Sequence, residues 1–172
     1  VLPELRRARL TVNYQIIGRS DDEIQEQFKT DAKQLSVEEL LYSATLTENA
    51  AEQKAIYETT AQLYPNDYRA LNNLASLAYK AGDLAAADSY VQKALQIAPA
   101  AAEANANKAL IALAQGKAEE AQTYLGKAAA AKNYNEILGN LQVAAGNYAQ
   151  SAQSLKGVNT NSAALSQLLS KN

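Results

Sequence analysis

The chain has 172 residues, enough for one domain with a buried core. Its 16 Lys+Arg and 18 Asp+Glu give a formal net charge of −2, so bulk electrostatics do not favour nucleic acid or a membrane surface as a partner. The sequence contains no His and no Cys, which excludes disulfides, the usual zinc ligands and the commonest general base.

The apolar composition favours helices that pack closely. Alanine is abundant, whereas the chain has one Phe, no Trp and no Met, and ten Tyr supply most of the aromatic volume. Alanine has the highest helix propensity and little bulk to hold backbones apart. The few Gly and Pro residues, 7 and 3, argue against a β-sandwich or barrel with many turns. No run of 18 apolar residues is present, so we expect no transmembrane helix.

Residues 1–19 form a basic segment unlike the rest of the chain. Four arginines, at positions 6, 7, 9 and 19, accompany one acidic residue, Glu4. Residues 9–16 alternate polar and apolar side chains, including β-branched ones, which predicts a short strand or extended segment. Three interpretations stay open: pairing with a neighbouring domain outside this chain, pairing with a second copy, or a flexible tail.

Two capping boxes mark the first helices. Ser20 precedes Glu23 by three residues and Ser36 precedes Glu39 by three, the spacing in which serine and glutamate cap each other's backbone N–H groups. We therefore expect helices to start after Ser20 and after Ser36.

A period of 34 residues runs through the middle of the chain. Four pairs of like residues stand at this spacing: Pro65 and Pro99, Gly82 and Gly116, Ala87 and Ala121, Ala94 and Ala128. A constant period of this length indicates a stack of repeated supersecondary units.

The best unit is predicted to fold as two helices joined by a tight turn. Residues 71–81 place apolar side chains at the spacing of an amphipathic helix. Gly82 then provides a helix stop, because a left-handed residue is tolerated best by glycine. Asp83 is a candidate N-cap for a second helix, and Pro99 ends it.

The C-terminal third departs from this spacing. Gly146 follows Gly116 by only 30 residues, so we expect the intervening helix to be cut short by a turn. Residues 157–161 are predicted to form a turn. A last helix over 162–171, with Leu165, Leu168 and Leu169 on one face, is expected to cap the stack.

With these positions in place, the chain resembles the tetratricopeptide repeat (TPR) family. Residues 68–101 match its pattern best, and residues 34–67, 102–131 and 132–156 form weaker units, with Lys108 and Asn133 standing where Leu and Pro are usual. The resemblance implies an all-α, TPR-like α-solenoid of antiparallel helix pairs over residues 20–172. The extended residues 1–19 would precede it, and residues 162–171 would form a capping helix.

The same resemblance implies a binding groove on the concave face, lined by the first helix of each unit. Carried over position by position, the groove residues are Arg69, Asn72, Ser76, Tyr79, Glu103, Ala106, Leu110 and Leu113. Such a mixed surface suits an extended or helical peptide. The lysines with which chaperone-binding relatives hold acidic tails are missing here.

Residues 5–12 also resemble the closing strand of OmpA-like peptidoglycan-binding domains, through Arg6-Arg7 leading into a strand-like stretch. Leu5 departs from the usual Asn, and the peptide-holding helix and loop are not in this chain, so no binding residue is carried over. The resemblance implies a bacterial cell-envelope protein, of the periplasm or outer membrane. Because the chain begins at Val1, we expect a fragment or a processed product.

No catalytic, metal or cofactor site is predicted. The acidic pairs, such as Glu38/Glu39 and Glu119/Glu120, occupy adjacent helical positions that do not face each other. The tyrosines lack the interleaved basic residues of a nucleic-acid surface, so we expect them in the core. We therefore expect a non-catalytic scaffold for a protein or peptide partner. The alternative is a structural spacer or assembly arm that self-associates or links an envelope-anchored domain.

Overall fold

The computed structural model describes residues 18–158 and 161–170. Every regular element in these ranges is helical, which confirms the all-α prediction for the described chain. The predicted strand over residues 9–16 lies outside the described residues.

Over the described residues, ten α-helices and one 3₁₀ helix follow one another along the chain. Their bounds are α1 (Asp21–Asp31), η1 (Ala32–Gln34), α2 (Val37–Ser43), α3 (Ala50–Leu63), α4 (Tyr68–Lys80), α5 (Leu84–Ile97), α6 (Ala102–Ala114), α7 (Ala118–Leu125), α8 (Tyr134–Ala144), α9 (Tyr148–Ser154) and α10 (Asn161–Leu169).

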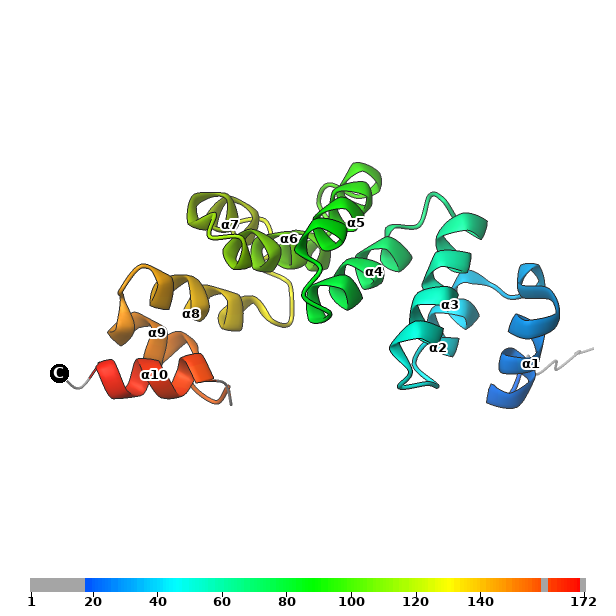
Figure 1. Ribbon diagram of the computed structural model, residues 1–172, viewed down its shortest axis with the longest axis horizontal. Coiled ribbons are helices and arrows are strands. Elements are labelled where there is room, and N and C mark those ends of the chain that lie inside the picture. Colours follow the sequence, from blue (N-terminus) through cyan, green and yellow to red (C-terminus); the bar gives the residue numbers. More distant parts are fainter. Residues whose placement is uncertain (1–17, 159–160, 171–172) are drawn as a thin grey trace, which may run out of the picture.

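The helices stack as consecutive hairpins into an arch (Figure 1). α4 packs most extensively against α5, α6 against α7, and α8 against α9, while α3 and α5 connect each hairpin to the next. In Figure 1, α5 and α7 lie on the outer side of the arch, and α4 and α6 lie beneath them. This arrangement is a TPR-like α-solenoid.

The predicted helix starts are capped as the sequence indicates. Ser20 and Ser36 each form a complete capping box with the glutamate three residues later, at the starts of α1 and α2. Asp83 accepts a hydrogen bond from the Ala86 N–H at 2.9 Å and so caps α5. These side chains satisfy N–H groups that have no partner inside the helix.

One turn geometry recurs in three hairpins. Gly82, Gly116 and Gly146 have φ angles of 80°, 76° and 76°. In each case the glycine N–H donates to the carbonyl three residues back, and the next N–H donates to the carbonyl five residues back. This is the Schellman motif, in which glycine occupies the left-handed position. The same backbone turn therefore closes all three hairpins and sets the direction of the second helix.

Small side chains line the contacts between paired helices. Ala75 in α4 and Ala87 in α5 are fully buried in one cluster with Val91 and Ile111. Separate clusters occupy the neighbouring junctions, one around Leu74 and Ile56 and another around Ile137. The core is thus a series of local interiors, as expected for a solenoid.

The expected shortening of the third hairpin is present. α7 has 8 residues, whereas α5 has 14. After Gly126 the chain leaves the helix, yet Ala128 and Ala131 stay buried in the cluster around Ile137. Turns in residues 126–133 therefore fill the space that the second half of a regular helix would occupy.

Lys108 lies in the interior and forms two ion pairs. It stands 34 residues after the core Leu74, and it is only 3 % exposed. Its ammonium group contacts Asp88 of α5 at 2.5 Å and Glu120 of α7 at 2.8 Å. Burial alone would lower the Lys108 pKa, but the hydrogen bonds and charges of the two carboxylates outweigh it and raise that pKa. The Lys at a Leu position is thus explained by a charged link between three helices.

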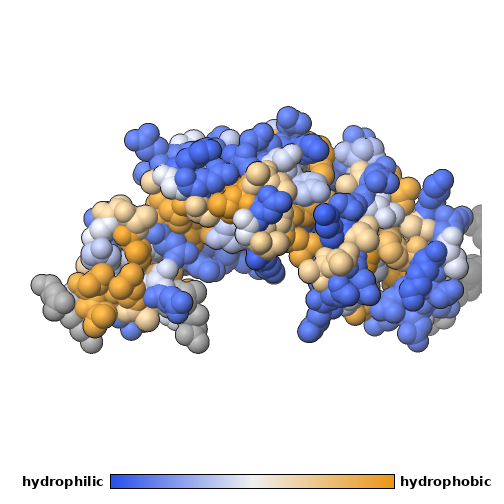
Figure 2. Space-filling model, viewed as in Figure 1, coloured by the Kyte–Doolittle hydropathy of each residue, from blue (hydrophilic) through white to orange (hydrophobic). Residues whose placement is uncertain are grey.

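The C-terminal helices pack without gaps at Gly139. A Cβ at this position would lie 2.3 Å from Cγ of the buried Leu155. Ser151 donates to the Gly139 carbonyl and shares a 2.8 Å hydrogen bond with Ser166 of α10. α10 therefore turns Ala163 and Ser166 inward, while Leu165 and Leu168 are 43 % and 66 % exposed. Figure 2 shows apolar surface gathered at this end of the arch.

We expect Gly82→Ala to destabilise the protein by about 1 kcal/mol, because alanine is strained at positive φ. Gly126→Ala is the matched control, since Gly126 has a helical φ of −58°. The control should be neutral or slightly stabilising. Urea unfolding followed by circular dichroism measures both, and equal effects would contradict the role assigned to the turn.

Lys108→Met should destabilise the protein by about 3 kcal/mol, because it leaves two partly buried carboxylates without their cation. The exposed Lys117, whose pair with Glu120 is 3.8 Å long, provides the control. Lys117→Met should change the free energy of unfolding by less than about 0.5 kcal/mol.

Replacing the whole cluster, with Asp88→Ala, Lys108→Leu and Glu120→Ala together, should return stability to within about 1 kcal/mol of the wild type. Chemical unfolding of all the variants checks this. A Lys108→Met protein as stable as the wild type would show that the ion pairs of Lys108 do not contribute to the free energy of unfolding.

Candidate functional site

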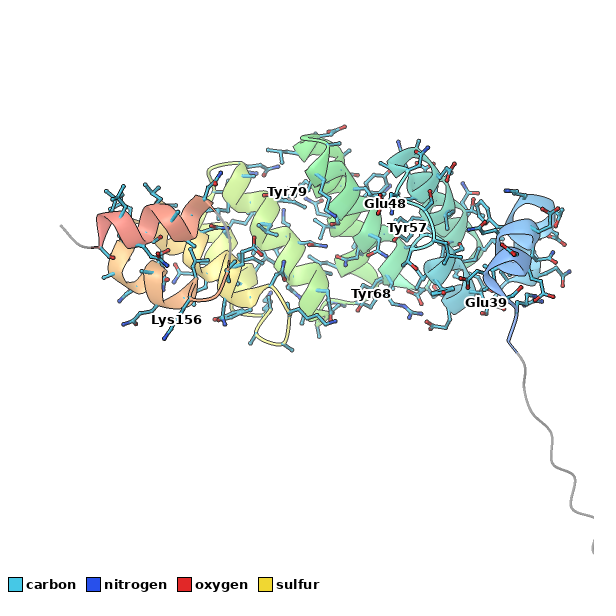
Figure 3. All side chains as sticks on the ribbon, turned by 90° about the horizontal axis from the view of Figure 1, so that it is seen from below. Glu39, Glu48, Tyr57, Tyr68, Tyr79 and Lys156 are labelled. Carbon is cyan, nitrogen blue, oxygen red and sulfur yellow. The ribbon has the colours of Figure 1, made fainter. Side chains whose placement is uncertain are left out.

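The inner side of the arch is the candidate site. Figure 2 shows the underside hollowed between the two ends of the molecule, and Figure 3 looks at it from below. Tyr68 and Tyr79, at the start and near the end of α4, lie at opposite long edges in Figure 3. Glu39 lies on the Tyr68 edge and Glu48 on the Tyr79 edge, so α2 and α4 run across the surface in the same sense.

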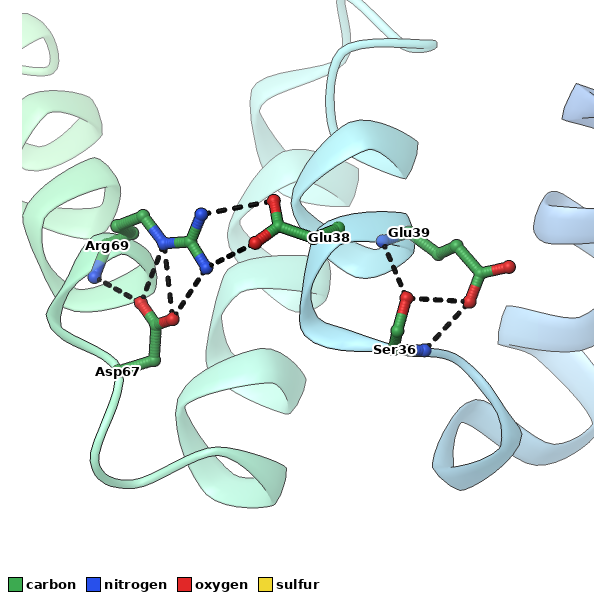
Figure 4. Close-up of polar contacts among 5 residues, drawn as sticks. All are labelled: Ser36, Glu38, Glu39, Asp67 and Arg69. Carbon is green, nitrogen blue, oxygen red and sulfur yellow. Dashed lines mark hydrogen bonds and ion pairs between the residues drawn. The ribbon is translucent and has the colours of Figure 1, made fainter. Parts of the chain in front are cut away.

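Arg69 joins the first helices of two hairpins. Its guanidinium binds Glu38 of α2 through two hydrogen bonds of 2.8 and 3.1 Å (Figure 4). It also donates from Nη2 to Oδ2 of Asp67 at 2.7 Å. Bidentate pairing with carboxylates is the strongest form of such contacts, and these bonds lower the pKa of Asp67 and raise that of Arg69. Arg69 therefore has two carboxylate partners within the protein.

The α2 capping box positions Glu38 for this contact. Ser36 and Glu39 hold the start of α2, with the Ser36 N–H donating to the Glu39 carboxylate at 2.8 Å (Figure 4). The Ser36 backbone bond, a hydrogen bond from Arg19 and the Ser36 hydroxyl lower the pKa of Glu39 to about 2. Helix α2 is thus anchored immediately beside the residue that binds Arg69.

Two further polar contacts cross from α4 to α6. The Asn107 amide donates to Oδ1 of Asn72 at 2.8 Å, and Asn72 is only 8 % exposed. At the edge of the face, the Tyr68 hydroxyl donates to Glu103 at 3.4 Å. Asn72 thus lies between the two helices, and its side-chain oxygen already has a partner.

The remaining predicted groove residues differ in exposure. Glu103 is exposed, while Ser76, Tyr79, Leu110 and Leu113 are half-buried, and Ala106 is buried. Tyr79 packs against the cluster around Ala75 and Val91, and Leu110 against the cluster around Ile137. Their exposed parts leave apolar surface for contact.

Side chains of α2 and α8 occupy the same positions as the groove residues of α4 and α6, although none of them is among the predicted groove residues. Counting back from the repeated glycine turn, Asn140 matches Ser76 and Leu110, and Val143 matches Tyr79 and Leu113. On α2, Tyr42 takes the Ser76 position, is 47 % exposed and donates to Asp21 at 3.1 Å. Gly146 follows Gly116 by 30 residues, and this spacing of the glycine turns is the sequence signal that aligns α8 with α4 and α6.

One polar atom on this extended face has no partner. Oδ1 of Asn140 is buried without a hydrogen bond in the described structure. In the part of the chain that the structure describes, no carboxylates gather into a group able to hold a metal ion. In the same residues, no helix combines the length and apolarity needed to cross a bilayer.

Comparison with known proteins bears on the fold. No protein-family model and no curated protein sequence matches the chain. Two crystal structures of MamA are similar to it, each at 16% identity, with TM-scores of 0.60 and 0.61. They cover 86% and 88% of this chain and 81% and 88% of their own.

A tetratricopeptide repeat protein from Parabacteroides merdae ATCC 43184 is also similar, at 15% identity and a TM-score of 0.65. The match covers 88% of this chain and 66% of that one. These likenesses confirm the TPR-like fold.

Stability should depend on the Glu39 cap in a pH-dependent way. Because the Glu39 pKa is lowered to about 2 from an ordinary 4.5, its contribution is complete above pH 4.5 and is lost as the pH falls towards 2. Glu39→Gln should therefore be less stable than the wild type at neutral pH, and the difference should shrink on acidification. Urea unfolding at a series of pH values measures this, with Glu48→Gln, an exposed glutamate in the α2–α3 turn, as control. A difference that stays constant with pH would contradict the assignment.

Proposed function

We propose that the chain is a non-catalytic scaffold that binds a peptide or a partner subunit on the inner face of its arch. One observation carries this: half-buried apolar side chains, Tyr79 and Leu113, recur at the same position of successive first helices. Val143 of α8 continues the row. Apolar groups in a row on a concave surface, with polar groups alongside, are the arrangement that peptide grooves use.

The charges of this face favour a partner that carries Lys or Arg. Glu136 stands ten residues before Gly146, as Asn72 stands before Gly82, and so belongs to the same face. Glu103 and Glu136 form no ion pair with any described residue. Arg69 is already matched by two carboxylates. A segment with basic and donor groups next to apolar side chains would complement these groups.

The absence of catalysis is part of the proposal. The sequence has neither His nor Cys, so a nucleophile with a histidine base cannot be assembled from this chain. Within the described residues, several acidic side chains act in helix caps or ion pairs, among them Glu39, Asp83 and Glu120. We propose no cofactor, and the net charge of −2 together with the lack of basic residues interleaved among the tyrosines argues against a nucleic-acid partner.

We propose a location in the bacterial cell envelope because of a resemblance in the N-terminal segment. Residues 5–12 resemble the closing strand of an OmpA-like domain, with Arg6-Arg7 entering a strand-like stretch. A helical scaffold following such a domain would lie in the periplasm, with the outer membrane or peptidoglycan nearby.

A structural spacer or assembly arm is the second candidate function. It is favoured by the exposed Leu165 and Leu168 on α10, at the end of the arch, where another protein surface would cover them. Light scattering over a concentration range separates the two functions. A concentration-dependent oligomer abolished by Leu168→Glu would favour the arm.

The groove is tested with an array of short synthetic peptides that vary basic, acidic and apolar content. Peptides with Lys or Arg beside apolar residues should bind best, as measured by fluorescence anisotropy. Tyr79→Ala and Leu113→Ala should each weaken the best binder about tenfold, the loss expected from removing one buried contact. Glu103→Gln should weaken basic peptides and flatten their salt dependence.

Leu168→Ala is the matched control, because this leucine is exposed outside the groove. Equal binding by wild type and Tyr79→Ala, with unchanged circular dichroism, would rule out this face as the site.

A further inference from the structure

Two clefts with equivalent linings open along the turn edge of the arch. The first, of about 440 Å³, lies between α1, the end of α2 and the start of α3. The second, of about 310 Å³, lies between α3, the end of α4 and the start of α5. Lining residues correspond at the 34-residue period: Ser43 with Leu77, Thr47 with Ala81, Glu52 with Ala86, and Ile56 with Tyr90.

These clefts are separate from the groove on the inner face. None of the predicted groove residues lines either cleft. The clefts lie where the first helix of a hairpin ends and the second begins. That is the edge marked by Glu48 and Tyr79 in Figure 3.

Each cleft has an apolar floor of a size that suits one large side chain. Phe28, Leu46 and Ile56 line the first, and Leu74, Leu77 and Tyr90 line the second. Leu74 and Ile56 are almost fully buried, at 2 % and 6 % exposure, so the floors are continuous with the core. An aliphatic or aromatic group entering such a depression is removed from water on most sides.

The two walls of each cleft carry opposite charges, in the same order in both clefts. Lys29 of α1 and Glu52 of α3 line the first cleft, and Lys54 of α3 and Asp83 before α5 line the second. Each cleft therefore carries one cation on the N-terminal wall and one carboxylate on the C-terminal wall. The two wall charges of each cleft cancel, so the clefts do not attract a polyanion or an anionic lipid surface.

The next junction is built differently. There Lys108 replaces Leu74 of the second cleft and binds Glu120, which stands 68 residues after Glu52. At this junction a charged side chain therefore takes the place of the floor leucine, and Asp88, which stands 34 residues after Lys54, binds it. The paired clefts belong to the N-terminal half of the arch.

We propose that these two clefts form a docking surface for one segment of a partner protein. The segment presents two apolar side chains, one per cleft, and carries charges of both signs, with acidic groups towards Lys29 and Lys54 and basic groups towards Glu52 and Asp83. The opposite charges on the walls of each cleft, and the 34-residue offset between the two linings, favour a single segment with these features. Binding at both clefts by one segment is bivalent, so the two contacts reinforce each other.

The chain's lack of cysteine allows each cleft to be watched separately. Ala55→Cys in the first cleft and Ala86→Cys in the second, each labelled with an environment-sensitive fluorophore, report occupancy. The probes are short synthetic peptides with two leucines at graded spacings on a background of alanine, glutamate and lysine. One spacing should change both reporters at the same peptide concentration, and replacing either leucine by alanine should weaken binding at least tenfold.

Filling and charge variants test the assignment further. Ala51→Trp fills the second cleft at an exposed helical position and should abolish the bivalent effect, whereas Ala85→Trp, exposed outside the clefts, should not. The double variant Lys29→Glu and Lys54→Glu alters only exposed side chains. It should reverse the positions at which the peptide prefers glutamate and lysine. Circular dichroism and unfolding confirm that each variant is folded.

Three results would overturn the proposal: no peptide of the set changes either reporter, leucine-free peptides act equally well, or Ala51→Trp binds like the wild type. Tyr79→Ala distinguishes this surface from the inner groove. It should leave cleft binding unchanged, and a loss of binding in that variant would assign the peptides to the groove instead.

Discussion

The close approach of two helices within each hairpin is the constraint on which this structure depends. Ala75 and Ala87 are fully buried at such a contact, where larger side chains would separate the backbones. The Schellman turn at Gly82 sends the second helix back at the angle that this contact requires. Because one hairpin cannot bury both of its faces, each must pack against the next, and the arch follows from repeating this step.

The stack is adapted at its weaker repeats by polar contacts. Lys108 replaces a core leucine, and two carboxylates from neighbouring helices compensate for its buried charge. Arg69 links α4 to α2 through Glu38, and Asn107 links α6 to α4 through Asn72. These contacts cost desolvation, so their value lies in fixing how one hairpin meets the next. They also occupy groups that a sequence pattern alone assigns to ligand binding.

The arch presents two surfaces of different character. The inner face carries apolar side chains at the same position in successive helices, next to Glu103 and Glu136, which pair with no cation in the described part of the chain. The turn edge carries two clefts whose walls have balanced charge. No predicted groove residue lines a cleft, so occupation of one of these proposed surfaces does not block the other. The exposed leucines of α10 add a third apolar area at the end of the arch.

The sequence alone determined the repeat and its class. The 34-residue spacing of Pro65 and Pro99 and of Gly82 and Gly116, together with the capping boxes at Ser20 and Ser36, predicts helix hairpins. These signals are local, because helix caps, left-handed glycines and amphipathic periods act within one or two turns of chain.

Tertiary structure decided which polar groups are occupied and where space is left. Arg69, Asn72 and Lys108 each bind one partner 20 to 35 residues away along the chain, namely Glu38, Asn107 and Asp88, so no local pattern reveals these contacts. The clefts likewise arise between three helices, and the outward face of α10 follows from Ser166 bonding to Ser151. Periodicity predicts what lies inside a helix pair, whereas the packing of one pair on another determines what remains free to bind.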